Sequence, residues 1–142
     1  MHLPTSLRSW LAGALIVLVA GVVAGCGSAP AASGGTVTSK QWQWAETTLQ
    51  NNATINDPSK YTIQFSSDGT FSGQNDCNQI AGSYTTTSSG GMTITPGPST
   101  LAACPPGSLS DIYLAGLSGV TSYALTDGRL VLNTTGGTMT FK

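Results

Sequence analysis

The segment YTIQFSSDGTFSGQ, residues 61–74, decides the class of fold that this sequence can form. Apolar and polar side chains alternate over residues 61–65, which places the apolar ones on one face of an extended strand. The triplet Ser67-Asp68-Gly69 comes next, and it favours a tight turn because glycine accepts a positive φ and aspartate can bond the turn backbone. Residues 70–74 then form the return strand, so the segment predicts a β-hairpin.

The same pattern of short alternating stretches and turn residues recurs on both sides of this hairpin. Further strands are predicted around Trp42 and Trp44 and at residues 79–84, 92–95, 122–125, 129–133 and 138–141. Asp127-Gly128 and Gly136-Gly137 supply the turns between the last three of them. The two tryptophans could line a ligand groove, but we expect them in the core because a domain this small needs their large burial. The fold class is therefore mainly β.

One segment, residues 108–119, has a helical period instead. Its apolar residues recur at intervals of three and four, namely Leu109, Ile112, Tyr113, Leu117 and Val120. Ser108 can accept a hydrogen bond from a free backbone N–H at the helix start, and Asp111 suits the positive helix end. Gly116 and Gly119 each weaken a helix by about 1 kcal/mol relative to alanine, so packing against the sheet must hold it. The sequence predicts one short amphipathic α-helix.

The N-terminus has the layout of a signal peptide. Arg8 precedes an apolar run over residues 11–24, which ends in Val23-Ala24-Gly25-Cys26. The run has about 14 residues, whereas a transmembrane helix needs about 20. The last four residues resemble the lipobox of bacterial lipoproteins, whose cysteine receives a diacylglycerol before cleavage. We predict a signal peptide at residues 1–25, lipid on Cys26, a tether at 26–39 and one domain at 40–142; an ordinary signal cut at residues 29–32 is the alternative.

Two cysteines remain in the predicted domain, Cys77 and Cys104. Outside the reducing cytosol we expect them to form a disulfide, which would restrict the unfolded chain by about 3 to 4 kcal/mol. The alternative is a pair of free buried thiols.

Charge and composition exclude several classes of function. The net charge is −1 and the few cations are scattered, which disfavours nucleic-acid binding. His2 is the only histidine and would leave with the signal peptide, which excludes histidine-based catalysis and histidine-ligated zinc from the mature chain. Most carboxylates lie beside turn residues or at the helix start, so Glu46 and Asp76 are the remaining candidates for a carboxylate-dependent hydrolase.

The oxygen-bearing residues Asn75, Asp76 and Asn78 surround Cys77 and could be considered for calcium. Their spacing matches no known calcium loop, and local bonding to turn backbone is the favoured interpretation. We therefore predict no metal and no cofactor.

An ordered set of short motifs over about 100 residues resembles the META domain family, which includes the heat-shock-inducible HslJ-like lipoproteins. The motifs are Trp42, Tyr61-Thr62-Ile63-Gln64-Phe65, Asp68-Gly69, Phe71-Ser72-Gly73, Cys77-Asn78, Gly82-Ser83-Tyr84, Ala103-Cys104-Pro105, Leu130-Val131-Leu132 and Phe141. Trp44, Leu101 and Ala102 depart from the family pattern without threatening the fold. The resemblance implies a compact antiparallel β domain, an orthogonally packed sheet or partly open barrel with one short helix, and no established enzymatic activity.

These observations lead to three functional hypotheses. The first is a non-catalytic lipoprotein, anchored through Cys26 at the outer face of the cell membrane, with a binding or stress-related role in the cell envelope. Its partner would be an unknown envelope protein or cell-wall component, and the protein itself would be a monomer. The second is a secreted inhibitor of an envelope hydrolase or protease, because a disulfide-held β scaffold with polar loops suits that task. The third is a hydrolase that uses Glu46 or Asp76.

Overall fold

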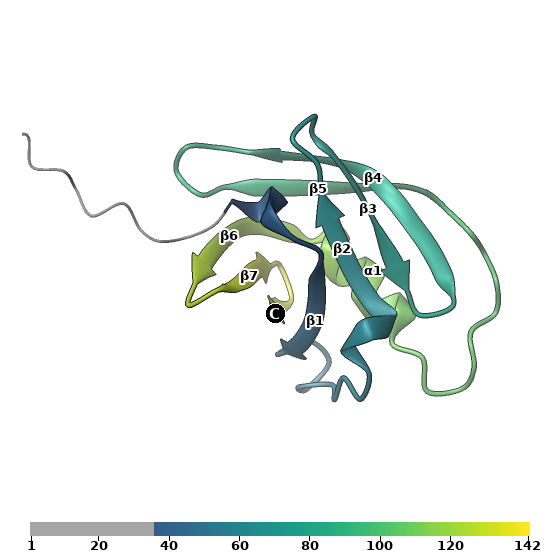
Figure 1. Ribbon diagram of the computed structural model, residues 1–142. Helices are drawn as coiled ribbons and strands as arrows, with labels where there is room; N and C mark the ends of the chain where they lie inside the picture. Colours follow the sequence, from purple (N-terminus) through teal and green to yellow (C-terminus); the bar gives the residue numbers. More distant parts are fainter. Residues whose placement is uncertain (1–35) are drawn as a thin grey trace, which may run out of the picture. The chain divides into compact units, whose positions relative to one another are not determined.

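The computed structural model describes residues 36–142, where eight antiparallel strands form one curled half-barrel sheet with a single α-helix (Figure 1). The elements are η1 Val37–Ser39, β1 Trp42–Thr47, η2 Pro58–Lys60, β2 Tyr61–Phe65, β3 Thr70–Asn75, β4 Asn78–Thr86, β5 Met92–Ser99, α1 Ser110–Ser118, β6 Val120–Thr126, β7 Arg129–Thr134 and β8 Gly137–Phe141. The predicted fold class is confirmed, and each predicted strand is present. The predicted signal peptide and Cys26 lie outside the described residues.

The hairpin predicted at residues 61–74 is formed by β2 and β3. Tyr61 pairs with Asn75 at one end of the ladder, and Phe65 pairs with Phe71 at the other. Asp68 closes the turn as expected, because its Oδ1 accepts hydrogen bonds from the backbone N–H of Thr70 at 2.9 Å and from the Thr70 hydroxyl at 2.6 Å. The turn chemistry read from the sequence is therefore the chemistry that forms it.

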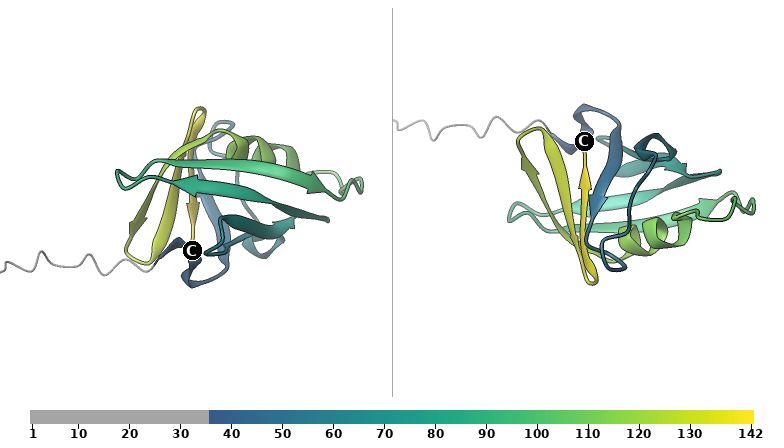
Figure 2. Two further views of the ribbon diagram at one scale, coloured as in Figure 1. Left: turned by 90° about the horizontal axis from the view of Figure 1, so that it is seen from above. Right: turned by 90° about the horizontal axis from the view of Figure 1, so that it is seen from below.

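The strand order is β5-β4-β3-β2-β1-β8-β7-β6, so β1 joins the first half of the sheet to the C-terminal strands. Trp42 pairs with Ile63 on β2, and Trp44 pairs with Phe141 on β8. The sheet curls until its two edges approach at one end, where the backbone N–H of Tyr123 donates to the carbonyl of Gly90 at 3.0 Å (Figure 2). The edge strand β5 carries two prolines, which an edge position tolerates because one side of its backbone has no ladder partner.

The helix begins at Ser110, two residues later than the predicted start. Leu109 occupies the N-cap. The Ser108 hydroxyl accepts a hydrogen bond from the backbone N–H of Ser110 at 3.2 Å, so it provides a partner for a free N–H at the helix start, as predicted. Asp111 lies in the first turn. The buried face of α1, with Tyr113 and Leu117, covers the hollow of the curled sheet beside β5 (Figure 2).

Both tryptophans of β1 belong to the core, with exposed fractions of 2% for Trp42 and 0% for Trp44. Trp44 forms a cluster with two tyrosines: its ring centroid is 5.6 Å from that of Tyr61 and 5.3 Å from that of Tyr113. Aromatic pairs at these separations add to the stabilisation that burial supplies. The interpretation of the tryptophans as core residues is confirmed.

The packed domain includes Val37–Ser39, which we predicted to be part of the tether. Val37 is buried, and its carbonyl accepts a hydrogen bond from Trp42 Nε1 at 2.7 Å. The segment Val37–Ser39 therefore packs on the sheet as a short 3-10 helix. Within residues 36–142, no helix has the length and apolar character that a membrane span requires.

Candidate functional site

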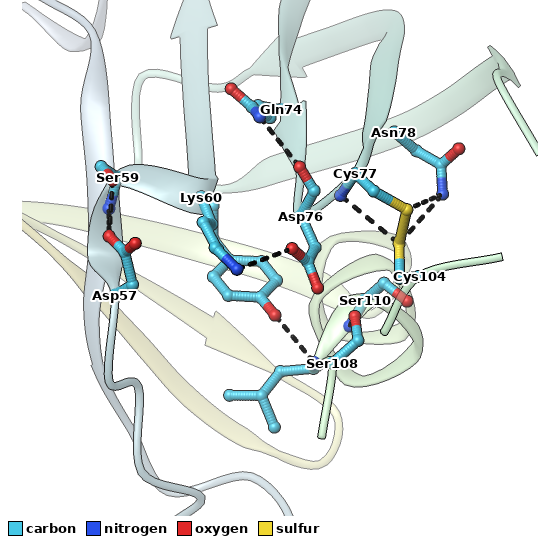
Figure 3. A network of polar contacts seen from close by, with 12 residues as sticks. Asp57, Ser59, Lys60, Gln74, Asp76, Cys77, Asn78, Cys104, Ser108 and Ser110 are labelled. Carbon is cyan, nitrogen blue, oxygen red and sulfur yellow. Dashed lines mark hydrogen bonds and ion pairs between the residues drawn. A yellow bond between two sulfur atoms is a disulfide. The ribbon is translucent and has the colours of Figure 1, made fainter. Parts of the chain in front are cut away.

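A disulfide between Cys77 and Cys104 organises one end of the half-barrel (Figure 3). Cys77 lies in the turn between β3 and β4, and Cys104 lies in the loop between β5 and α1. Their Cα atoms are 5.5 Å apart, a separation that ordinary disulfides have. The bond ties the long loop, residues 100–109, to the rigid end of the sheet.

Asn78 makes a second attachment between the same two segments. Its Nδ2 donates to the Ala102 carbonyl at 3.0 Å, and its Oδ1 accepts from the Ala102 backbone N–H at 2.8 Å and from the Thr100 hydroxyl at 3.0 Å. The side chain is 9% exposed, so these bonds are largely shielded from water. The amide therefore bonds a distant loop rather than the local turn backbone that we expected it to bond.

Asp76 is a buried carboxylate beside the disulfide. It is 7% exposed, its φ is 57°, and its Oδ1 lies 3.5 Å from Lys60 Nζ at the end of η2 (Figure 3). The Ser108 hydroxyl and, less strongly, the Lys60 ammonium lower the pKa of the Asp76 carboxyl, while burial opposes them. A positive φ costs aspartate less than most residues. The carboxylate is thus held in its charged form at the end of the sheet.

Tyr61 fixes the other end of the loop, because its hydroxyl accepts a hydrogen bond from the Leu109 backbone N–H at 2.8 Å. A small pocket of about 170 Å³ lies here, lined by Lys60, Tyr61, Asp76 and Ser108 among others. Lys60 pairs with Asp76, and Tyr61 bonds Leu109, so these charged and hydroxyl groups already have partners within the domain.

A larger groove of about 450 Å³ lies on the other side of the loop, and we call it the loop groove. It runs from the end of β3 past the disulfide to the first turn of α1. Leu101 and Leu114 are its largest apolar residues. Its polar lining residues are Asn75, Asn78, Ser99, Thr100, Ser108, Ser110 and Asp111. Leu101 is 93% exposed and is the one large hydrophobic side chain exposed to this degree among residues 36–142.

Asn75 is the unusual member of the loop groove. The residue is 5% exposed, and within the described part of the chain its buried Oδ1 has no hydrogen-bond partner. A buried acceptor left without a donor costs about 1 to 3 kcal/mol. Such groups are rare in folded proteins, and each calls for an explanation.

The two candidate catalytic carboxylates each form an ion pair, and the pairs involve different elements. Glu46 on β1 lies 2.7 Å from Arg129 of β7, with both side chains largely in solvent. Asp76 pairs with Lys60 in the disulfide region. The described residues contain no group of three or more Asp, Glu, His or Cys side chains that could hold a metal ion.

The sequence singled out Cys77, Cys104, Asp76 and Asn78. It did not indicate that Asn75 would lack a hydrogen-bond partner or that Lys60 would pair with Asp76. Asn75 was considered only as a possible calcium ligand. Its burial and its lack of a partner are features of the folded domain that no local pattern indicates. The ion pair of Lys60 with Asp76 could have been predicted from the β2–β3 hairpin, because its pairing places residue 60 opposite residue 76. In the structure the Asp76 backbone N–H donates to the Lys60 carbonyl at 2.7 Å.

Comparison with known proteins agrees with this architecture. A crystal structure of a DUF4847 family protein from Bacteroides vulgatus is similar with a TM-score of 0.54 and 18% identity, covering 74% of this chain and 92% of that one. An NMR structure of a protein from Burkholderia xenovorans has a TM-score of 0.57 and 22% identity, covering 75% of this chain and 82% of that one. These likenesses show the fold alone. No curated protein matches the chain. The META domain model matches residues 35–142, and the chain therefore belongs to the META domain family.

Proposed function

We propose that this chain is a non-catalytic META-domain module that lipid on Cys26 holds at the outer face of the cell membrane. There it binds an envelope protein or a cell-wall component. The observation that carries the proposal is the loop groove, whose wall is held by the disulfide and by Asn78. A rigid, partly open groove lined by both polar and apolar residues suits binding.

The Cys77–Cys104 bond supports an extracytoplasmic location. Disulfides persist in oxidising compartments and are rare where thiols are kept reduced. Lipid on Cys26 would agree with this location, because it would hold the domain at the outer face of the membrane.

The ion pairs of Glu46 and Asp76 support a non-catalytic role. A glycosidase needs two carboxylates that flank one bond, whereas these two bind separate cations on different elements. The test is hydrolysis of cell-wall polysaccharide by the wild type and by the Glu46→Gln, Asp76→Asn double variant. We expect no turnover by either protein; turnover that the double variant loses would establish the hydrolase alternative instead.

The anchor is tested with a fatty-acid probe in cells that express the wild type, Cys26→Ala or Ser28→Ala. We expect labelling and membrane association in the wild type and in the Ser28→Ala control, and loss of both in Cys26→Ala. One short acyl chain holds a protein only marginally, while two or more hold it stably, so losing the diacyl group should release the domain. Continued labelling of Cys26→Ala would refute the anchor.

The binding role is tested by cross-linking in intact cells with the wild type, Leu101→Asp and Asp127→Asn. Leu101 is exposed at the rim of the loop groove, and Asp127 lies in the β6–β7 turn, so neither change removes a core contact. We expect one envelope component that the wild type and Asp127→Asn capture and Leu101→Asp does not. If all three proteins capture the same components, the loop groove is excluded as the binding site. If the captured component is a hydrolase or protease that the domain inhibits, the inhibitor hypothesis replaces the first.

A further inference from the structure

Residues 99–104, which we call the Leu101 segment, carry a more specific inference, which rests on the binding role proposed above and names the kind of protein bound. The segment begins the loop between β5 and α1, which runs along the outside of the domain (Figure 1). Residues 100–103 are all exposed, and the backbone of residues 100–105 forms no helix, strand, turn or bend. The Leu101 side chain is 93% exposed. The segment is therefore an extended stretch of chain that presents one large apolar side chain to solvent.

The residue before Leu101 is fixed to the start of β4. The Thr100 backbone N–H donates to the Gln79 carbonyl at 3.2 Å. The Thr100 hydroxyl accepts from the Gln79 backbone N–H at 2.9 Å and donates to Asn78 Oδ1 at 3.0 Å. Three hydrogen bonds thus hold the chain on this side of Leu101.

The residue after Leu101 is fixed as well, through both of its backbone polar groups. The Ala102 N–H donates to Asn78 Oδ1 at 2.8 Å, and the Ala102 carbonyl accepts from Asn78 Nδ2 at 3.0 Å. Two residues further on, Cys104 is bonded to Cys77. Leu101 is therefore a free side chain between two fixed residues. A partner that binds this segment has little backbone ordering left to supply, which favours affinity.

The composition of the segment indicates the kind of cleft that accepts it. Residues 99–108 carry no charge, and the neighbours of Leu101 are small, namely Thr100, Ala102 and Ala103. An endopeptidase binds its substrate as an extended chain and selects one side chain in a primary pocket, which is apolar in some enzymes and acidic in others. An acidic pocket selects lysine or arginine and has no partner here. Leu101 fits an apolar pocket.

We propose that the Leu101 segment is a substrate-like loop that inhibits a serine endopeptidase with an apolar primary pocket. Leu101 fills that pocket, and its carbonyl carbon meets the nucleophilic serine. A serine enzyme agrees with the compartment in which the Cys77–Cys104 disulfide persists, because an exposed thiol nucleophile is prone to oxidation there. Such a partner would give the inhibitor hypothesis its site.

The contacts of Ala102 explain why the enzyme is inhibited rather than supplied with a substrate. Attack of the serine hydroxyl on the Leu101 carbonyl carbon forms an ester with the enzyme and breaks the Leu101–Ala102 C–N bond, and the hydroxyl proton passes through the enzyme's base to the Ala102 nitrogen. In an ordinary substrate this amine diffuses away and water hydrolyses the ester. Here Asn78 and the Cys104 disulfide keep the amine beside the ester. Its return re-forms the peptide bond and gives the proton back to the serine.

The test is inhibition of two probe enzymes by the full chain in non-ionic detergent micelles, with the disulfide oxidised. Chymotrypsin has an apolar primary pocket, and trypsin has an acidic one. Hydrolysis of a small chromogenic substrate of each enzyme is measured as the chain is added. We expect inhibition of chymotrypsin with a Ki below about 1 μM and no inhibition of trypsin at the same concentrations.

Leu101→Lys should exchange these two specificities. Inhibition of chymotrypsin should weaken at least about thirtyfold, because the side chain that fills the primary pocket is a binding hot spot, while inhibition of trypsin should appear. The substitution removes no core contact, since Leu101 is exposed. Asp127→Asn, in the β6–β7 turn, is the control and should match the wild type against both enzymes.

Asn78 is a positioning residue in this proposal, and cleavage of one bond tests it. Mass spectrometry after incubation with chymotrypsin should show that Asn78→Ala is cut between Leu101 and Ala102 at least about tenfold faster than the wild type, because the leaving amine is no longer held. Asn78→Asp keeps the two acceptor bonds and should lie between them. An unchanged thermal melt separates release of the loop from general unfolding. If Asn78→Ala does not fold, the Leu101→Lys exchange decides alone.

The proposal is overturned if the wild type leaves chymotrypsin uninhibited or if Leu101→Lys gains no inhibition of trypsin. It is also overturned if chymotrypsin cuts the wild type between Leu101 and Ala102 as fast as it cuts a synthetic peptide of residues 97–107, since the segment would then be an ordinary cleavage site. The anchoring and cross-linking experiments are measured in cells and do not depend on this result. A Leu101-dependent partner captured in cells, together with uninhibited chymotrypsin, would keep the binding role and remove the inhibitory loop.

Discussion

Met139 on β8 packs directly against Gly116 of α1. A Cβ atom on residue 116 would lie 2.6 Å from Met139 Sδ and 2.8 Å from Leu49 Cδ1, closer than Cβ atoms approach other side chains. Both Gly116 and Met139 are buried. A glycine that weakens the helix on propensity alone thus permits the close contact between α1 and the sheet.

Gly116→Ala is therefore expected to destabilise the domain, although alanine is the better helix former by about 1 kcal/mol. Overpacking typically costs about 1 to 3 kcal/mol, so we expect a net loss of about 1 kcal/mol in the free energy of unfolding. Urea unfolding measures it. Ser118→Ala, an exposed change on the same helix, is the control and should lie within about 0.5 kcal/mol of the wild type. A more stable Gly116→Ala variant would show that the contact relaxes freely.

The strands could be predicted because each of their causes is local. Alternation over Tyr61–Phe65 places one face inward, and Asp68-Gly69 makes the turn, so residues within a few positions of one another determine the hairpin. The helix was predicted from spacing as well. Its start differed by two residues, because the Ser108 hydroxyl bonds the N–H of Ser110 while Leu109 takes the N-cap.

The site was less predictable because its causes are distant in sequence. The pairing of β1 with β8 closes the sheet across most of the domain, and no local pattern specifies it. Asn75 lines the same groove as a loop that follows it by about 25 to 35 residues, and its unpartnered Oδ1 is evident only in the folded structure. Residue type indicated an acceptor at this position, but burial and the lack of a partner are properties of the tertiary structure.

Tyr113 and Tyr61 give a matched pair of tests in one aromatic cluster, with ring centroids 5.5 Å apart. The Tyr61 hydroxyl accepts from the Leu109 N–H, whereas the buried Tyr113 hydroxyl has no partner among the described residues. Tyr61→Phe should cost about 1 to 3 kcal/mol because it leaves that N–H without an acceptor. Tyr113→Phe should be neutral or stabilising, since it removes a hydroxyl whose burial is uncompensated. Equal losses in urea unfolding would indicate that the Tyr113 hydroxyl is satisfied, for example by an internal water.

Asp76 should make stability depend on acid pH. The Ser108 hydroxyl and the Lys60 ammonium lower the folded-state pKa of Asp76 below its unfolded value of about 4. The unfolded chain then binds the proton more tightly, so the contribution of Asp76 is present above that unfolded value and is lost as pH falls through the lower folded one. Asp76→Asn should flatten the decline of unfolding free energy between about pH 5 and pH 2.

Asp127→Asn is the control for that experiment. Both aspartates have positive φ, 57° for Asp76 and 51° for Asp127, and asparagine accepts this backbone conformation as readily. The two substitutions thus differ in the loss of the Lys60 and Ser108 contacts rather than in backbone strain. Asp68, whose pKa the Thr70 hydroxyl lowers, keeps part of the acid dependence in both variants. An identical pH profile for Asp76→Asn and Asp127→Asn would show that the Asp76 contacts contribute nothing to folding.

The Cys77–Cys104 disulfide should supply a large share of the stability of this domain. It closes a loop over a sequence separation of 27 residues, which in the chain-entropy model restricts the unfolded state by about 3 to 4 kcal/mol. We expect the Cys77→Ser, Cys104→Ser double variant to lose about 2 to 5 kcal/mol and to melt about 10 °C or more below the wild type.

The aromatic core around Trp44 lies on other elements, so the far-ultraviolet circular dichroism of the double variant should remain native at low temperature. The Asn78 bonds to Ala102 should also persist, because they do not use sulfur. Thiol titration of the unreduced wild type in denaturant, together with thermal melts of both proteins, tests the prediction. Two free thiols per domain, or coincident melts, would show that the cysteines only fill space. A variant that fails to fold at any temperature would show that the loop cannot pack against β3 and β4 without the disulfide.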